Sequence, residues 1–386
     1  MAQIRYLTTI EIEAGALRHV AAGCENIGIR RPLLVTDAGV RAAGLVDRAL
    51  GELKGVSHVA VFDQTPSNPT EAAVLDAVVI YKRENCDGLI ALGGGSSIDC
   101  AKGVSIAATH EGSLKTYATI EGGSPKISEH VAPLIAIPTT AGTGSEVARG
   151  AIIIVADGRK LGFHSWHLMP KLALLDPDLT LGLPPLLTAA TGMDAIAHCM
   201  ETFMSPAFNP PADGISLDGL ERGWANIAIA THDGKNVDAR LQMMSASMQG
   251  AMAFQKGLGC VHSLSHSLGG VNPGLHHGTL NAMFLPAVIR FNARADSVIR
   301  ERRLERMATA MGLGTPSSAD QAAQTLGEAI KSLNQRLGLP SGLAAMGVEP
   351  GCFDRVIDGA LVDHCHKTNP RIASREDYLQ ILRDSM

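Results

Sequence analysis

The chain has 386 residues, of which 46% are hydrophobic and 18% charged, and its formal net charge is −5. This composition is typical of a globular protein and excludes a disordered chain, and no basic stretch points to nucleic-acid or membrane-surface binding. Because the length exceeds that of a usual single core, two domains are expected.

The seven cysteines are scattered, and none lies in a C-x-x-C pair. This pattern indicates reduced thiols in a cytoplasmic enzyme and argues against a disulfide framework or a structural zinc lobe. The opening stretch MAQIRYLTTIEIEAG has no basic region followed by an apolar run, so no signal peptide is expected. No apolar run approaches the roughly 18 residues that a membrane span needs.

Strand and helix patterns alternate in the first half of the chain. Helical periodicity covers residues 71–84, and a further helix is expected after the glycine loop at 93–97. Strand-like, largely apolar runs cover 31–37, 58–63, 88–97 (running into that loop) and 132–140. Buried strands that alternate with helices predict a parallel sheet covered on both faces.

The character of the sequence changes near DPDLTLGLPPLLT (176–188), where the adjacent prolines Pro184 and Pro185 interrupt the chain. Thr188 is expected to cap the helix that follows. Helical spacing then dominates, with helices predicted at 188–204, 214–231, 238–257, 278–294 and 317–336. We therefore predict an α/β domain over residues 1–182 and an all-helical domain over residues 183–386.

Two stretches of the helical half set ionisable side chains among apolar ones. TGMDAIAHCMET (191–202) places Asp194 and His198 four residues apart, on one face of a helix. GCVHSLSHSLGGVNPGLHHGTLNA (259–282) predicts a helix, a loop and a helix, and carries His262, His266, His276 and His277. One carboxylate and several imidazoles suit a divalent metal such as Fe²⁺ or Zn²⁺. The alternative is a group of imidazoles that are only hydrogen-bonded within the core.

Glycine-rich loops follow two of the predicted strands. GGGSS (93–97) opens a helix, whose first N–H groups can hold a pyrophosphate, although it is not the G-x-G-x-x-G fingerprint. PTTAGTGSE (138–146) offers hydroxyl groups that can bind phosphate or ribose. Asp37, at a strand end, could bind a ribose hydroxyl and would repel a 2′-phosphate. Plain turns, and a helix N-cap at Asp37, are the alternatives.

Five motifs in order give the chain a family likeness: GGGSSIDCAK, PTTAGTGSEVAR, DPDLTLGLPPLLTAATGMDAIAHCMET, HSLSHSLGG with HHGTLNA, and DHCHKTNPR (363–371). Together they resemble the iron-dependent (group III) alcohol dehydrogenases over nearly the whole chain. The resemblance implies a dehydroquinate-synthase-like fold, with an N-terminal Rossmann-like nucleotide domain and a C-terminal helical metal domain. It also implies a homodimer.

The resemblance implies metal ligation by Asp194, His198, His262 and one histidine of the HHG sequence. Members of the family commonly have one histidine before this glycine, whereas this chain has two. Counting forward from His262 selects His276, and counting back from Gly278 and Asn281 selects His277. We predict His277, because the following helix sets its position, and keep His276 as the alternative. Iron is the expected ion, and zinc shares the same ligands.

The resemblance further implies NAD as the cofactor. His266 lies one turn after His262, and we predict that it relays a proton, with a packing or supporting role as the alternative. The expected cofactor-binding residues are Asp37, Asn68, Gly94, Gly95, Ser96, Asp99, Thr139, Thr140, Ser145 and Lys160.

Within the family, GRKLGFHSWHLMP (158–170) and FNPPADGISLDGLERGW (208–224) most resemble the bacterial 4-hydroxybutyrate dehydrogenase branch. This implies hydride transfer between NAD and a short-chain hydroxy compound, with 4-hydroxybutyrate oxidised to succinate semialdehyde. The alternatives are another small alcohol, diol or hydroxy acid as the substrate, or a metal- or nucleotide-binding regulator without turnover. Candidate partners of a substrate carboxylate are Arg149, His164, Trp166, His167 and Lys367.

Overall fold

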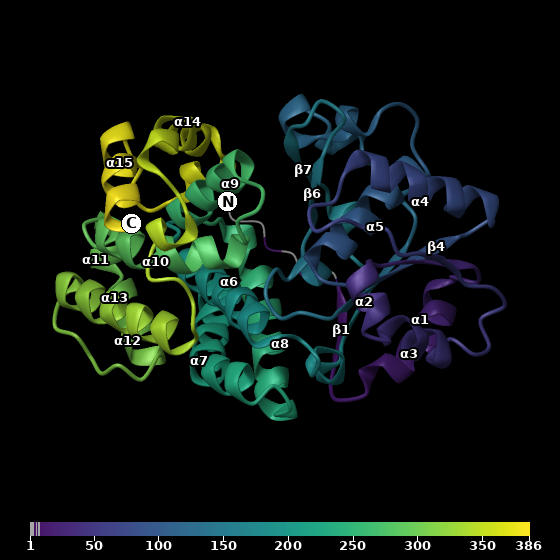
Figure 1. Cartoon of the computed structure of the whole chain (residues 1–386), viewed down its shortest axis with the longest axis horizontal. Helices are drawn as coiled ribbons and strands as arrows, with labels where there is room; N and C mark the ends of the chain where they lie inside the picture. The colour runs from purple at the N-terminus through teal and green to yellow at the C-terminus, as the bar shows by residue number, and fades with distance from the viewer. Residues whose placement is uncertain (1–3, 5, 7) are drawn as a thin grey trace. The chain divides into compact units, whose positions relative to one another are not determined.

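The computed structural model describes residues 4, 6 and 8–386 of the chain (Figure 1). The chain divides into two compact units, and the boundary lies between Gly182 and Leu183. The N-terminal unit is built around a parallel sheet, and every regular element of residues 183–386 is a helix.

The sheet of the N-terminal unit has six strands in the order β1-β8-β5-β4-β2-β3, and every neighbouring pair is parallel. The predicted parallel sheet is therefore confirmed. In spatial order the strands are β1 (Thr9–Ile12), β8 (Leu172–Leu175), β5 (Leu134–Pro138), β4 (Gly88–Gly93), β2 (Pro32–Val35) and β3 (Ala60–Phe62). Strands β1 and β8 were not predicted from the sequence.

Helices cover both faces of this sheet, because successive strand residues point to opposite sides. Leu33 and Leu89 join one core, with helices α4 (Glu71–Arg83) and α5 (Gly95–Ala107). Leu34 and Ile90 join the other core, with helices α1 (Val20–Ile27) and α3 (Leu45–Glu52). Figure 1 shows the two pairs of helices on opposite sides of the strands. A sheet buried on both faces explains why its strands are continuously apolar.

The order of the strands creates a switch point between β2 and β4. The chain passes from β2 to β3 on one side and then returns to β4 on the other side of β2. In open parallel sheets, ligands bind at the carboxyl ends of the strands that flank such a point. Asp37 and the short helix α2 (Ala38–Ala42) follow β2, and the glycine loop follows β4. The fold thus brings the two predicted nucleotide-binding segments together.

An antiparallel hairpin, β6 (Gly150–Ile154) and β7 (Lys160–His164), was missed by the sequence analysis. It packs against α5. Asp99 of α5 fastens it, because the carboxylate accepts a hydrogen bond from the backbone N–H of Ile152 at 2.9 Å. This contact joins the hairpin to the helix that begins at the glycine loop.

In the helical unit, α6 is surrounded by α7, α8 and α10. The five helices predicted for this half are present as α6, α7, α8, α10 and α13, with shifted ends. The helices of the unit are α6 (Pro185–Met204), α7 (Pro210–His232), α8 (Val237–Ala253), α9 (Cys260–Val271), α10 (His277–Asn292), α11 (Asp296–Arg300), α12 (Arg303–Ala310), α13 (Ala319–Arg336), α14 (Phe353–Val362) and α15 (Arg375–Asp384).

The predicted start of α6 at Thr188 is wrong. The helix begins at Pro185, and Thr188 lies inside it, where its hydroxyl accepts a hydrogen bond from Arg240 at 2.7 Å. Proline suits the first helical position, because its missing N–H would have no helical partner there and its φ angle is already helical. Pro184 and Pro185 therefore mark the beginning of the helix and do not merely interrupt the chain.

No helix among the described residues combines the length and the apolar character that a membrane crossing requires.

Candidate metal centre and nucleotide-binding loops

Helix α6 carries the first two predicted metal ligands. Asp194 and His198 lie one turn apart, both are buried, and the Asp194 Oδ1 atom is 3.7 Å from the His198 Nε2 atom. The helix is buried throughout residues 188–204, so these two groups lie in an apolar environment. A buried carboxylate and imidazole need compensating partners, since isolated burial of a charge is costly.

Helices α9 and α10 bring two further imidazoles to the same carboxylate oxygen. The Nε2 atoms of His262 and His277 each lie 3.6 Å from the Asp194 Oδ1 atom. Gly278 allows this approach, because a Cβ atom at that position would lie 2.1 Å from the carbonyl oxygen of Ala190 on α6. The first turn of α10 therefore lies directly against α6.

The two adjacent histidines before Gly278 have different positions. His277 is the first residue of α10 and faces Asp194, whereas His276 is the exposed N-cap residue of that helix. The structure thus brings His277 to the cluster and leaves His276 at the surface. Backward counting from the glycine and Asn281 agrees with this placement, and forward counting from His262 does not.

The donor set fits a divalent metal ion. The Asp194, His198 and His262 ligand atoms all lie within 4.8 Å of one another, and His277 adds a fourth. Ligands bound at about 2.1 Å in a tetrahedron are separated by about 3.4 Å, which is close to the 3.6–3.7 Å separations from Asp194 Oδ1. Three imidazoles and one carboxylate are chemically suited to iron or zinc.

Asn281 was missed as a member of this cluster. Its buried amide nitrogen donates to the Asp194 Oδ1 atom at 2.7 Å and lies 3.2 Å from the Nε2 atoms of both His262 and His277. The side chain is on α10, one turn after His277, and so points to the same place. Asn281 therefore fixes the Asp194 carboxylate relative to the two imidazoles.

Burial and the close approach of the ionisable groups set the pKa values of the cluster. Burial alone raises the pKa of Asp194, but His198, His277 and His262 outweigh it and hold that pKa far below its usual range. Burial opposes charge on His262, yet the Asp194 and Glu201 carboxylates, as hydrogen-bond acceptors and negative charges, raise its pKa to about 9. Burial also holds the pKa of His277 well below its ordinary value. The carboxylate is therefore ionised and attracts positive charge.

His266, the predicted proton relay, lies beside the cluster. Its ring stacks on His277 with centroids 5.3 Å apart and an interplanar angle of 11°. Its Nδ1 atom is 3.1 Å from the Oδ2 atom of Asp363, which the sequence analysis did not single out. With Nδ1 turned to a carboxylate, the Nε2 atom is left to exchange a proton.

The first predicted nucleotide-binding segment joins Asp37 to the glycine loop. Asp37 caps α2 through the N–H of Val40 at 3.0 Å, and its other oxygen accepts from the Ser97 hydroxyl at 3.1 Å. Gly93 has a φ of +152°, and a Cβ there would lie 2.5 Å from the Ser97 Oγ atom, so only glycine fits. Asp37 thus forms the predicted N-cap while lying at the switch point.

The second segment, residues 138–146, lies against the first. Gly94 caps α5 and Gly95 begins it, and added Cβ atoms would contact the side chains of Thr140 and Thr143 respectively. The amide of Thr139 donates to the Gly93 carbonyl at 3.0 Å. These hydroxyl-bearing side chains and the first N–H groups of α5 form the kind of surface that binds phosphate.

The remaining predicted cofactor residues have partners within the chain. Ser145 donates its hydroxyl to Asp99 at 2.6 Å, and Lys160 donates to Asn68 at 2.9 Å. The hydroxyl of Ser96 donates to the carbonyl of Ser67. Asp99 and Ser145 therefore hold the loop against α5.

Lys102, also missed by the sequence analysis, completes this arrangement. Its fully buried ammonium lies 2.7–2.9 Å from four oxygens: the carbonyls of Ser145, Ala148 and Gly150, and the Ser145 hydroxyl. A single side chain thereby fixes the course of residues 145–150. Its spacing of three residues from Asp99, on one helix face, is the pattern that would have indicated it.

The candidate partners of a substrate carboxylate differ in what they contact. Arg149 is exposed and stacks its guanidinium over the Trp166 ring, 4.7 Å from the centroid. The Nδ1 atom of His164 is 2.9 Å from the Thr119 hydroxyl oxygen. His167 and Lys367 are exposed.

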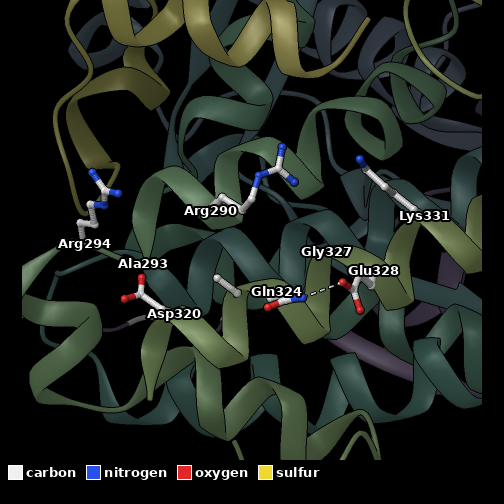
Figure 2. Close-up of a pocket in the computed structure, with 9 residues that line it drawn as sticks. Arg290, Ala293, Arg294, Asp320, Gln324, Gly327, Glu328 and Lys331 are labelled. Carbon is white, nitrogen blue, oxygen red and sulfur yellow. Dashed lines mark hydrogen bonds between the residues drawn. The ribbon is translucent and has the colours of Figure 1, made fainter. Parts of the chain in front are cut away.

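A separate pocket of about 460 Å³ lies where the end of α10 meets α13 (Figure 2). Its charged lining includes Arg290, Arg294 and Lys331 together with Asp320 and Glu328. His277, at the start of α10, is about 20 Å away from Arg290 along the helix axis, at 1.5 Å per residue. The pocket is therefore distinct from the metal centre.

Comparison with known proteins identifies the family. The sequence profile described as iron-containing alcohol dehydrogenase matches residues 8–177, and the profile of the family's C-terminal part matches residues 188–386. The chain belongs to the iron-containing alcohol dehydrogenase family. The resemblance inferred from the motifs is thus confirmed, and this dehydrogenase acts on a small hydroxy compound.

Relatives of the dehydrogenase match it over nearly its whole length. It is 65% identical to the 4-hydroxybutyrate dehydrogenase of Cupriavidus necator, with 100% of both chains covered. It is 37% identical to the 1,3-propanediol dehydrogenase of Klebsiella pneumoniae, over 96% of this chain and 95% of the relative.

Solved structures of the family have the same fold. A 1,3-propanediol oxidoreductase superposes with a TM-score of 0.94 at 35% identity, with 100% of both chains covered. A sulfoacetaldehyde reductase from Bifidobacterium kashiwanohense, in complex with NAD⁺, superposes with a TM-score of 0.89 at 25% identity and covers 100% of this chain and 98% of its own. The expected fold, an α/β unit followed by a helical unit, is confirmed.

Proposed function

We propose that this dehydrogenase oxidises 4-hydroxybutyrate to succinate semialdehyde, with NAD⁺ as the hydride acceptor and a divalent iron ion held by Asp194, His198, His262 and His277. The convergence of three imidazole Nε2 atoms on one carboxylate oxygen carries the metal assignment. The 65% identity to a 4-hydroxybutyrate dehydrogenase supports the substrate. The NAD⁺ complex of a structural relative and the loops at the switch point support the cofactor.

The reaction removes a hydride from the alcohol carbon and a proton from its hydroxyl. Asp194, His198, His262 and His277 would hold the divalent ion, which would supply Lewis acidity to the alcohol oxygen. The Nε2 atom of His266 accepts the hydroxyl proton, while Asp363 holds Nδ1 and with it the orientation of the ring. The loops that follow β2, β4 and β5 would hold NAD⁺, whose nicotinamide would supply the hydride acceptor.

An assay of NADH formation tests this function. Metal-free enzyme reloaded with Fe²⁺ should show its highest kcat/KM on 4-hydroxybutyrate, compared with 1,3-propanediol and 1-butanol. Chelation should abolish turnover and Fe²⁺ should restore it. Undiminished turnover after thorough chelation would contradict the metal assignment. A higher kcat/KM on 1,3-propanediol would show that 4-hydroxybutyrate is not the preferred substrate.

The fourth ligand is tested by two neighbouring variants. His277→Ala should weaken metal binding strongly, because it removes a ligand atom. His276→Ala is the matched control and should leave the metal dissociation constant within about twofold, since His276 is exposed. If His276→Ala weakened metal binding more than His277→Ala, His276 would be the ligand instead.

We also propose the cytoplasm as the location, since all seven cysteines are free thiols. The homodimer stays a prediction, and sedimentation of the purified enzyme checks it.

A further inference from the structure

Glu201 is a buried carboxylate behind the metal centre. It lies on α6, one turn after His198, and its side chain is 1% exposed. Its Oε2 atom is 2.5 Å from the Nδ1 atom of His262, on the ring edge opposite the nitrogen that faces Asp194. The two residues are separated by 61 positions in the chain.

The same carboxylate also binds the beginning of α9. Its Oε1 atom accepts the N–H of Val261 at 2.7 Å, and its Oε2 atom accepts the N–H of His262 at 3.3 Å. Gly259, the N-cap residue, provides no capping side chain. A Cβ at Gly259 would lie 2.8 Å from the Glu201 Oε1 atom, so glycine is what admits the carboxylate. The Glu201 carboxylate thus takes the place of a capping side chain at this helix N-terminus.

A carboxylate that already accepts two backbone N–H groups can only accept a hydrogen bond from the imidazole. The proton of neutral His262 therefore lies on Nδ1, and the lone pair lies on Nε2. This Nε2 atom is the one that lies 3.6 Å from Asp194 Oδ1. The ring is further held by stacking on His198, with centroids 4.7 Å apart.

From this geometry we propose that Glu201 is a positioning residue, which sets the tautomer and orientation of His262 and so raises the affinity of the centre for its divalent cation. The inference rests on the proposed metal centre and deepens it. A carboxylate behind a metal-bound histidine also increases the basicity of the ligand, and loss of such a partner typically weakens metal binding by about 10–100-fold.

Glu201→Gln separates this role from simple helix capping. The amide keeps the size of the side chain, but it has one acceptor atom for two positions that both require an acceptor. If the amide oxygen faces Val261, the NH₂ group faces the Nδ1 atom of His262. This favours the tautomer that carries its proton on Nε2, and a protonated Nε2 atom has no lone pair to bind a metal. If the amide is rotated by 180°, its NH₂ group faces the N–H of Val261, and two donors cannot form a hydrogen bond.

The test is a Zn²⁺ titration of the metal-free full-length enzyme against a chromophoric chelator. Glu201→Gln should raise the zinc dissociation constant about 10–100-fold. Thr202→Val is the matched control, because its buried hydroxyl on the same helix has no hydrogen-bond partner, and it should bind zinc as the wild type does. A Glu201→Gln protein that melts at a lower temperature but binds zinc within twofold of the wild type would overturn the proposal.

A second measurement does not depend on how the variant folds. In the zinc-loaded wild-type enzyme, nitrogen-15 histidine spectra should show the His262 proton on Nδ1, and a proton on Nε2 would overturn the proposal. Asp194→Ala separates the two hypotheses. If it binds zinc as tightly as the wild type, the proposed metal centre itself fails. If Asp194→Ala loses zinc while Glu201→Gln does not, only the role of Glu201 fails.

Discussion

Two buried polar clusters, one in each unit, differ in how they are neutralised. In the N-terminal unit, the Lys102 ammonium is surrounded by four oxygens, and Asp99 accepts from both Ser145 and Ile152. In the helical unit, the groups facing Asp194 Oδ1 are three imidazole nitrogens and one amide donor. The first cluster contains its own cation, whereas the second concentrates acceptors that suit a cation bound from outside.

The contrast between the two clusters distinguishes polar groups that stabilise the fold from polar groups that bind a ligand. A buried charge with a full set of chain partners stabilises a segment, and its loss should reduce stability. A cluster whose acceptors converge on one point is suited to a ligand, and its loss should reduce ligand binding and activity. Substitutions in the Lys102 cluster should therefore reduce stability, whereas substitutions in the Asp194 cluster should reduce metal binding and activity.

The largest effect is expected from Asp194→Ala combined with His198→Ala. Removing two of four proposed ligands should lower kcat/KM by at least about 10³-fold, or roughly 4 kcal/mol of transition-state stabilisation. NADH formation in the presence of Fe²⁺ measures this loss, and NADH binding followed by fluorescence should be unchanged. A double variant with a kcat/KM within tenfold of that of the wild type would show that the reaction does not need the metal.

Lys102→Met should act on stability. It leaves buried Asp99 and three backbone carbonyls without their cation, and breaking such a buried set costs about 3–5 kcal/mol. Urea denaturation measures the change in the free energy of unfolding. Lys115→Met is the matched control, because Lys115 pairs with Asp157 at the surface and such pairs contribute about 0–1 kcal/mol. Equal losses for the two variants would contradict the structural role of Lys102.

Glu146, in the second glycine loop, should make stability depend on pH. Burial raises its pKa from 4.5 to about 7. Between these values the folded chain binds the proton and the unfolded chain does not, so the free energy of unfolding falls as the pH rises from about 4.5 to about 7. The decline amounts to at most about 3 kcal/mol.

Glu146→Gln should flatten this decline, because the amide carries no titrating proton. Urea denaturation at pH 5 and pH 8 measures the difference between variant and wild type. Glu52→Gln, at an exposed position, should leave the decline in place. A Glu146→Gln variant whose stability declines as steeply as that of the wild type would exclude Glu146 as the cause of the decline.

The smallest effect concerns substrate choice. Arg149 is stacked on Trp166, which leaves the N–H groups at the edge of its guanidinium able to bind a carboxylate in a bidentate manner. Arg149→Gln should raise the KM for 4-hydroxybutyrate about 10–100-fold, as expected for a lost charge-assisted hydrogen bond. The KM for 1-butanol should stay the same. Equal losses on both substrates would assign Arg149 to packing.

Much of the fold could be predicted because its patterns are local. The apolar strands β2, β3, β4 and β5 and the periodic helices α4, α6 and α13 were recognised from period and composition alone. The strands that were missed are β1, β6, β7 and β8, and their length does not explain this, because the recognised strands β2 and β3 are no longer than these. The pairing of β1 with β8 joins segments more than 160 residues apart, as in Thr9 with Leu172, and no local pattern reports it.

The candidate site divides in the same way. Residue spacing alone places Asp194 and His198 on one helix face and shows that further histidines follow, and the motifs alone indicate the family. Only the tertiary structure decided that His277 and not His276 lies beside Asp194, that Glu201 meets His262, and that Asp363 holds His266 across 97 residues. The physical reason is that helical periodicity fixes neighbours within one element, whereas contacts between elements depend on how their surfaces pack.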